Sequence, residues 1–429
     1  MKELEGQKRV AIENIYPQLD CGKYPIKRVI NEIINVRADI FVDGHDQVKA
    51  SLLYRKKQKG KENKWKETSM NFISNDHWQG SFLPESEGTF EYVIEAWVDH
   101  FSTWQHGLKK KFEDHQDIKT ELLIGAELMG KALMNAPNAQ KKKLEQSIDL
   151  FRTHKNEAKT VSYALSDTVS SMMHGLYEKE KATCFSKTLL VKVEPKQALF
   201  SAWYEFFPRS TSQTEGQHGT FKDCERILPR IAGMGFDVVY LPPIHPIGTD
   251  YRKGLNNAVT AQPGDPGSPW AIGSSEGGHK AIHPELGTFE DFDSMVKIAG
   301  ELNIKIALDF AIQCSPDHPY VKKHPDWFKW RPDGTVQYAE NPPKKYQDIL
   351  PVNFETEDWV NLWKELKSIV DFWIGKGVRI FRVDNPHTKS FRFWEWLINE
   401  VHTKNPDIIF LAEAFTRPRV MEKLSLIHI

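Results

Sequence analysis

The chain has 429 residues, of which 40% are apolar and 27% charged, and its formal net charge is −1. These values are ordinary for a globular protein of roughly two to four domains. The balanced charge argues against a general nucleic-acid or membrane surface. No apolar run approaches the length of a membrane span, and the charged start Met1–Gly6 lacks the apolar segment of a signal peptide.

Cysteine usage gives a further limit. The four cysteines are scattered and form no C-x-x-C pair, so we expect neither a disulfide framework nor a structural zinc site. This pattern is typical of the reducing cytoplasm, which is the location that we expect.

Residues 1–103 have the pattern of short strands. Phe90, Tyr92 and Ile94 mark the clearest alternation, and Asp43-Gly44 and Glu87-Gly88 supply turns. The segment predicts an N-terminal β-sandwich. Its basic run over 56–66 is better explained as a solvated hairpin loop than as a nucleic-acid site.

Helical periodicity follows. From about residue 117 apolar side chains recur at helical spacing, and a strand pattern returns at Lys187–Val193. We therefore predict a helical bundle over 104–182, inserted before the last sandwich strand at 183–196. Such apolar stripes usually form a packing face, although an exposed one would instead bind a partner subunit.

Strands and helices alternate over residues 197–429. The predicted strands are 199–206, 236–242, 304–309 and the two that lead into Asp384 and Glu413. Thr288 is a helix cap, and 314–356 is an irregular insertion. Crossover helices make the strands parallel, which predicts a (β/α)₈ TIM barrel with about five strands present. A doubly wound sheet is the competitor, but no glycine-rich phosphate loop follows the first strand.

Five strands are fewer than the eight of a closed barrel. The sequence stops at Leu424–Ile429, where the next helix begins. A barrel fragment leaves sheet edges open. We therefore expect that the sequence is truncated, and that its last residues, Leu424–Ile429, do not have to belong to the original protein.

Two carboxylates are the strongest candidates for chemistry. Asp384 and Glu413 end apolar strands that one helix joins, so they meet at the same edge of a parallel sheet. Retaining glycoside chemistry needs one ionised and one protonated carboxyl group. Arg382 shares the strand face of Asp384 and would keep it ionised, whereas apolar neighbours would keep Glu413 protonated.

The plain structural alternative is that both acids are strand-end caps or core ion pairs. Each strand alone is a weak signal. The ordered set Asp309, Asp384 and Glu413, each at the end of a predicted strand, is a much stronger one.

Three stretches that contain these acids, Ile306–Gln313, Phe381–Asp384 and Phe410–Glu413, resemble short motifs of the α-amylase family of retaining glycosidases and transglycosidases. Longer segments resemble the subgroup that transfers maltosyl units from maltose 1-phosphate to α-1,4-glucans, and the resemblance spans the chain to about Leu424. These segments are Asn256-Asn257, Trp270–His279, Gln313–Pro319, Glu340–Asp348 and Asp384–His387.

The resemblance implies roles for matching residues. Asp384 would form the covalent β-maltosyl ester, and Glu413 would be the acid/base. Maltose 1-phosphate would be bound by Lys253, Gln313, Asp348 and Asn385, with Asn341, Lys344 and Tyr346 near its phosphate or sugar rings. Cations and hydrogen-bond donors suit a phosphate leaving group. Lys253 and Lys344 lie in polar loops, so a plain surface role stays open for both.

The resemblance also sets limits. Hydrolases of the family usually carry Asn-His where this chain has Gln313-Cys314, which favours transfer over hydrolysis. The family's third catalytic carboxylate comes from a later strand, so the chain as written is expected to be inactive. No metal or organic cofactor is expected, and a homodimer is. A retaining hydrolase and a non-catalytic glucan-binding fragment remain the alternatives.

Overall fold

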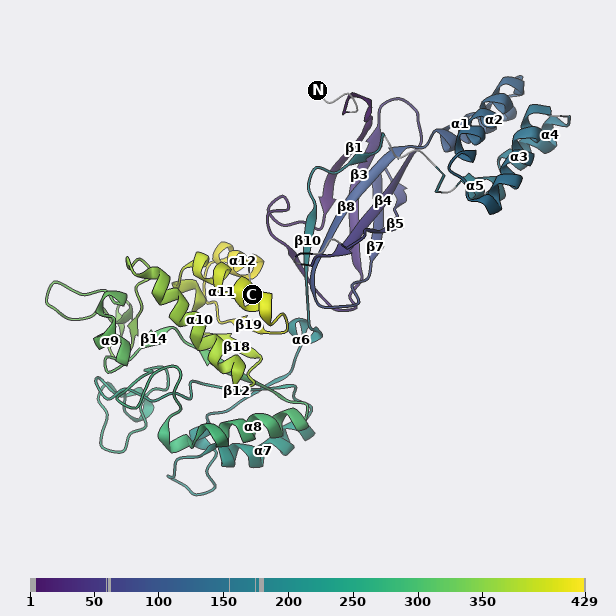
Figure 1. Cartoon of the computed structure of the whole chain (residues 1–429). Coiled ribbons are helices and arrows are strands. Elements are labelled where there is room, and N and C mark those ends of the chain that lie inside the picture. The colour runs from purple at the N-terminus through teal and green to yellow at the C-terminus, as the bar shows by residue number, and fades with distance from the viewer. Residues whose placement is uncertain are drawn as a thin grey trace. The chain divides into compact units, whose positions relative to one another are not determined.

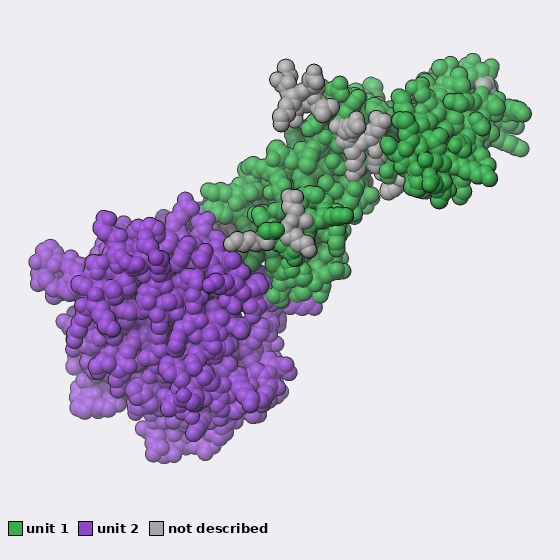
Figure 2. Space-filling model, in the orientation of Figure 1, with its two compact units in different colours: residues 1–193 green, residues 194–429 purple. Residues whose placement is uncertain are grey.

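The structure is a computed structural model that describes residues 5–427 except 59, 61–62, 154, 174 and 177–180. The chain divides into two compact units, 1–193 and 194–429 (Figure 2). No helix among the described residues is long and apolar enough to cross a membrane.

The described part of the first unit contains two mainly antiparallel sheets that share one hydrophobic core. One has the order β1-β3-β7-β6, formed by Val10–Tyr16, Ile34–Val42, His77–Phe82 and Asn71–Ser74. The other has the order β2-β10-β8-β4-β5, with β9 beside β8. Its strands are Ile26–Val29, Leu189–Glu194, Gly88–Val98, Val48–Lys56, Lys66–Ser69 and Thr183–Cys184.

Helices fill the sequence between β8 and β9 (Figure 1). They are α1 His100–Glu113, α2 Lys119–Leu133, α3 Asn138–Thr153, α4 Glu157–Ala164 and α5 Asp167–Met173. Their buried apolar side chains form a core of their own. α1 begins before the predicted helical region because Asp99 caps it. The Asp99 carboxylate accepts a hydrogen bond from the Ser102 amide at 3.0 Å and pairs with Lys49 at 2.7 Å.

Glycine at position 125 is required by the packing of α2 on α1. A Cβ atom there would lie 2.1 Å from the Trp104 ring, whereas a Cβ at Gly130 of the same helix would meet nothing within 4 Å. We expect Gly125→Ala to lower the free energy of unfolding by about 1–3 kcal/mol through overpacking. Gly130→Ala, the matched control, should raise it by roughly 0.5–1 kcal/mol. Urea denaturation measures both, and equal effects would contradict the packing argument.

The second unit is built on a parallel sheet of order β11-β12-β13-β18-β19. Its strands are Trp203–Glu205, Val238–Leu241, Lys305–Phe310, Ile380–Val383 and Ile409–Ala412. The order in space follows the order in sequence. A doubly wound sheet instead reverses its strand order at a switch point, so this topology goes against that competitor.

Helices between these strands are α6 Lys196–Leu199, α7 Phe221–Gly233, α8 Phe289–Glu301, α9 Pro319–Lys323, α10 Trp359–Gly375, α11 Phe391–Lys404 and α12 Pro418–Ile427. α7 and α8 lie side by side (Figure 1), with the Phe221 and Phe292 rings 5.4 Å apart. Thr288 caps α8 as predicted, through a reciprocal capping box with Asp291.

The two faces of the parallel sheet are packed differently. Strand residues such as Val239 and Leu308 belong to a large core with α7, α8, α10 and α11. Alternate residues, among them Val238, Ala307 and Ile380, form a small separate cluster that includes no helix residue. One face is therefore covered by helices, whereas a doubly wound sheet is covered on both.

Two features differ from the predicted elements. The expected strand over 199–206 is wrong in its first part, because α6 ends at Leu199 and β11 begins only at Trp203. Leu199 and Phe200 are exposed, at 71% and 79%, so this apolar run is not a buried strand. The irregular insertion contains two small antiparallel pairs, β14 Gln313–Cys314 with β17 Leu350–Pro351, and β15 Ala339–Asn341 with β16 Lys344–Tyr346.

Candidate active site

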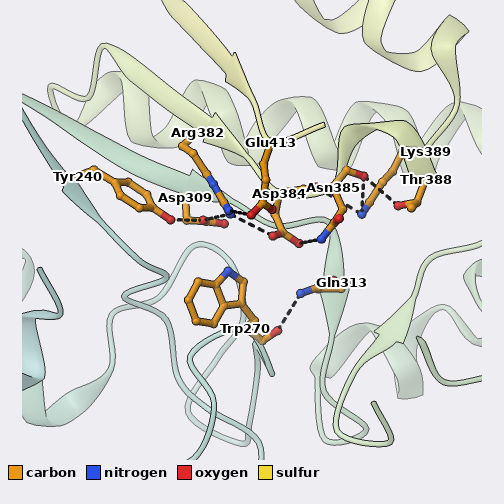
Figure 3. Close-up of polar contacts among 10 residues, drawn as sticks. All are labelled: Tyr240, Trp270, Asp309, Gln313, Arg382, Asp384, Asn385, Thr388, Lys389 and Glu413. Atoms are coloured by element: carbon orange, nitrogen blue, oxygen red, sulfur yellow. Dashed lines mark hydrogen bonds and ion pairs between the residues drawn. The ribbon is translucent and has the colours of Figure 1, made fainter. Parts of the chain in front are cut away.

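Polar side chains gather where β13, β18 and β19 end (Figure 3). β18 pairs with β19 in parallel, with Val383 opposite Ala412, so the next residues, Asp384 and Glu413, emerge side by side. The Glu413 amide donates to the Val383 carbonyl at 3.0 Å and continues this ladder. The adjacency predicted from the two strand patterns is thus confirmed.

Arg382 joins the carboxylates of three neighbouring strands. Its Nη1 lies 2.6 Å from Asp309 Oδ2 and 3.0 Å from Asp384 Oδ1, and its Nη2 contacts Glu413 Oε1 (Figure 3). The Asp309 side chain is fully buried and that of Asp384 is 8% exposed. A buried carboxylate stays charged only beside a cation or strong donors. Arg382 therefore places one positive charge beside the carboxyl groups of Asp309, Asp384 and Glu413.

Glu413 is in a different electrostatic position. Burial raises the pKa of its carboxyl group, and the adjacent Asp384 carboxylate raises it further, while Arg382 opposes both. The pKa of Glu413 therefore lies above the ordinary value of a glutamate. Asp384 and Glu413 place two carboxyl groups within reach of one guanidinium.

The sequence places Asp309 in the ordered set of strand-end acids without a defined role, and it does not single out its partner Tyr240. The Tyr240 hydroxyl donates to Asp309 Oδ2 at 2.6 Å (Figure 3). Burial raises the pKa of Tyr240, so the phenol stays a donor. Burial also raises the pKa of Asp309 to about 7, against the opposing effect of Arg382. Tyr240 lies on the strand face that bears Val238, and the alternation of the predicted strand is the signal that could have pointed to it.

Lys389 is a second residue that the sequence did not reveal. Its Nζ donates to the carbonyl oxygens of Asp384 at 3.4 Å and Asn385 at 3.3 Å. Burial lowers the pKa of Lys389 to about 8, although the nearby carboxylates act in the opposite direction. Asn385 has a left-handed backbone at φ 43°, and its Nδ2 donates to Asp384 Oδ2 at 3.3 Å. Lys389 and Asn385 thus secure the turn that presents Asp384.

A cleft of about 880 Å³ opens beside this cluster. Most of the site residues predicted from the sequence line it, and Arg382, Glu413 and Lys344 are the exceptions. Arg382 and Glu413 lie beside the cleft through their contacts with Asp384, whereas Lys344 is exposed at the turn of the β15–β16 hairpin. The predicted residues that line the cleft are Lys253, Gln313, Asn341, Tyr346, Asp348, Asp384 and Asn385.

Several polar atoms around the cleft are buried without a partner among the described residues. They include Trp270 Nε1, Asp348 Oδ1 and His387 Nδ1. Burial raises the pKa of Asp348, and the positive charge of Lys253 opposes this shift. Unpaired buried polar groups are costly, and these three belong to residues that line the cleft.

A group of residue types that can bind a metal ion lies outside the residues that line the cleft. His279, Cys314 and His318 are buried with ligand atoms within 4.8 Å of one another. However, His318 Nδ1 accepts from the Tyr320 amide at 3.0 Å, so its Nε2 carries the proton and donates to His279 Nδ1 at 3.1 Å. His279 Nε2 then donates to the Ala311 carbonyl at 2.9 Å. Both lone pairs are used, and this group fits a neutral hydrogen-bonded histidine pair better than a metal site.

Two adjacent carboxyl groups at the carboxyl ends of parallel strands, beside a polar cleft, are the arrangement with which retaining glycosidases and transglycosidases perform a double displacement. The comparisons with known proteins agree with this class. The sequence profile for domain N/S of α-1,4-glucan:maltose-1-phosphate maltosyltransferase matches residues 8–195.

Curated relatives extend the match. The α-1,4-glucan:maltose-1-phosphate maltosyltransferase of Chlorobaculum tepidum is 52% identical over 424 residues, which cover 99% of this chain and 63% of the relative. A protein of the same name from Cereibacter sphaeroides is 46% identical over 416 residues, which cover 97% of this chain and 69% of that protein. A crystal structure of an α-amylase from Lactobacillus plantarum is 30% identical, with a TM-score of 0.42, over 51% of this chain and 46% of that one.

The chain therefore belongs to the family of α-1,4-glucan:maltose-1-phosphate maltosyltransferases. It spans 63% of the length of the Chlorobaculum relative.

Proposed function

We propose that the protein transfers maltosyl units from α-maltose 1-phosphate to the non-reducing end of an α-1,4-glucan, with release of phosphate and retention of the α anomer. The observation that carries this proposal is the Asp384–Arg382–Glu413 cluster at the mouth of a polar cleft. Membership of the family supplies the donor and the acceptor, which are named in the relatives that the chain resembles.

The proposed catalytic roles of Asp384 and Glu413 follow from their different electrostatic surroundings. Asp384, ionised beside Arg382, attacks the anomeric carbon and forms a β-maltosyl ester as phosphate leaves. Glu413, protonated at the start, assists the leaving group and then accepts the proton of the incoming sugar hydroxyl. Both steps are carboxylate chemistry, so the proposal includes no metal and no organic cofactor.

The cleft residues have proposed roles in binding. Lys253, Asn385 and Asn341 supply a cation and amide donors for the phosphate and adjoining hydroxyl groups. Gln313, Asp348 and Tyr346 contact the sugar rings. Lys344 is also proposed to lie near the donor, from the β15–β16 hairpin.

The wider arrangement is part of the proposal. The parallel sheet over 197–429 forms the first part of a (β/α)₈ barrel, and the sheets of 1–103 and 183–196 form a β-sandwich into which the helices of 104–182 are inserted. The protein is proposed to be a cytoplasmic homodimer that binds neither nucleic acid nor membrane. A further carboxylate from a later strand is proposed to stabilise the transition state.

A coupled assay tests the function. The complete gene product is incubated with maltose 1-phosphate and a short α-1,4-glucan, and both phosphate and chain length are measured. We expect one phosphate released for each maltosyl unit added. Phosphate release with free maltose as product would indicate a hydrolase instead. Retention on a glucan column without turnover would indicate a binding protein.

A further inference from the structure

The loop between Ile247 and Gly267 carries Lys253, and its shape is set by hydrogen bonds rather than by regular structure. The Ala261 amide donates to the Arg252 carbonyl at 3.1 Å, and the Gly254 amide donates to the Ala258 carbonyl at 2.9 Å. These bonds close short turns inside the loop. The beginning of the loop is joined to the segment after it by the Gly248 amide, which donates to the Ala271 carbonyl at 3.0 Å. A side chain adds a second connection between the two ends.

The Arg252 side chain makes that connection. Its Nη1 donates to the carbonyl oxygens of Ile247 at 3.4 Å and Gly248 at 3.0 Å, where the loop begins. Its Nε donates to the Asp265 carbonyl at 3.1 Å and its Nη2 to the Pro266 carbonyl at 2.9 Å, where the loop ends. One half-buried guanidinium thus bridges both ends of the loop. Lysine offers a single nitrogen and cannot reproduce this fork.

A second clamp holds the beginning of the loop. Asp317 Oδ2 accepts from the Thr249 amide at 2.6 Å, the Thr249 hydroxyl at 2.9 Å and the Asp250 amide at 2.9 Å. These donors lower the pKa of Asp317 and keep it ionised, although burial opposes them. Asp317 lies shortly after Gln313, another cleft residue. The clamp therefore ties the segment that precedes Lys253 to the segment that presents Gln313.

Lys253 follows Arg252 directly and lines the cleft, where its charge acts on Asp348. The segment that bears Lys253 is held by the Arg252 side chain and by the Asp317 clamp. We propose that Arg252 is a positioning residue, which holds Lys253 where the phosphate group of the donor binds and so sets the preference for a phosphorylated donor. This inference rests on the proposed function, because it takes a sugar phosphate as the ligand of Lys253.

The test compares two donors with the same sugar. Maltose 1-phosphate carries the phosphate, whereas α-maltosyl fluoride does not. In the complete gene product, Arg252→Lys should raise KM for maltose 1-phosphate about tenfold to 100-fold, the effect expected for a misplaced charge-assisted hydrogen bond, and change kcat less than about threefold. KM for α-maltosyl fluoride should stay within about twofold. Inhibition by inorganic phosphate should weaken by the same factor as KM.

A double-mutant cycle shows whether Arg252 acts through Lys253. In a Lys253→Met background, Arg252→Lys should have little further effect on KM for maltose 1-phosphate. An undiminished effect there, or an equal rise in KM for both donors, would overturn the proposal. A wild-type protein that releases no phosphate from maltose 1-phosphate would instead refute the proposed function, which separates the two failures.

Two further variants separate the positioning role of Arg252 from a general loss of folding. Arg226→Lys, at a guanidinium that donates to the Thr211 carbonyl at 2.8 Å outside the loop, should leave both KM values unchanged. Asp317→Ala releases the loop from its other clamp and should reproduce the donor-specific rise in KM even if Arg252→Lys is unstable. Normal KM values in Asp317→Ala, or in a folded Arg252→Lys, would count against the positioning role.

Discussion

Replacing Asp384 with alanine in the complete gene product is expected to lower kcat for maltosyl transfer by a factor on the order of 10⁴ or more. Without this carboxylate no ester can form, and the remaining groups can only bind the donor. Arg382 keeps Asp309 at 2.6 Å and its contact with Glu413, so the variant should fold. Initial rates of phosphate release measure the effect, and circular dichroism confirms folding.

The matched control uses an aspartate at the other end of the same strands. Asp407 precedes β19 and pairs with Arg379 at 3.4 Å, before β18 begins. Asp407→Ala removes a surface ion pair worth about 0–1 kcal/mol in stability and should leave kcat unchanged. A near-normal rate in Asp384→Ala would remove Asp384 from the nucleophile's role, whatever the control shows.

The pair of carboxylates could be predicted because its position depends on local patterns. Asp384 and Glu413 each follow a short apolar strand, and one helix connects the strands, so parallel pairing brings them together. The Thr288 cap depends on residues only three apart. In both cases the determining information lies within one supersecondary unit, and no knowledge of the remaining fold is needed.

Tyr240 and Lys389 depend on contacts that the sequence does not display. Tyr240 reaches Asp309 from a neighbouring strand, 69 residues away in sequence. Lys389 lies in a polar stretch where a lysine is normally solvated, and only the turn at Asn385 directs its Nζ to backbone carbonyls. Leu199 and Phe200 show the opposite error, since an apolar run was interpreted as a buried strand but is exposed in the structure.

The residues that line the cleft could be predicted only in part. Its lining comes from segments that are far apart in the sequence, represented by Lys253, Gln313 and Asp348. No periodicity connects these residues, and only the resemblance to a family grouped them before the structure did. Trp270 and His387 belong to segments that the resemblance includes, and the structure showed that they line the cleft. Their buried nitrogens have no partner among the described residues. Their discovery required the cleft itself, because an isolated Trp or His in a loop is most often part of the packing.

Glu413→Gln is expected to lower kcat/KM for maltose 1-phosphate by a factor of about 10²–10⁴, the usual contribution of general acid–base catalysis. The amide keeps the shape of the side chain but carries no proton to exchange. The wild-type rate should fall as pH rises through the pKa of Glu413, because the acid is then lost. Burial and Asp384 raise this pKa, so the alkaline limb lies above the ordinary range of a glutamate. The variant should lack that limb.

Chemical rescue separates this role from a structural one. In Glu413→Ala the β-maltosyl ester on Asp384 should persist, because no base activates the acceptor. Azide needs no base and would attack the ester from the opposite face, so it should restore turnover and give α-maltosyl azide. The control is Glu365→Gln, which removes another partly buried carboxylate. Glu365 lies in α10 and pairs with Lys280 at 2.8 Å, and its replacement should keep the wild-type pH profile. An unchanged alkaline limb in Glu413→Gln, or no azide product from Glu413→Ala, would show that the proton is carried by another group.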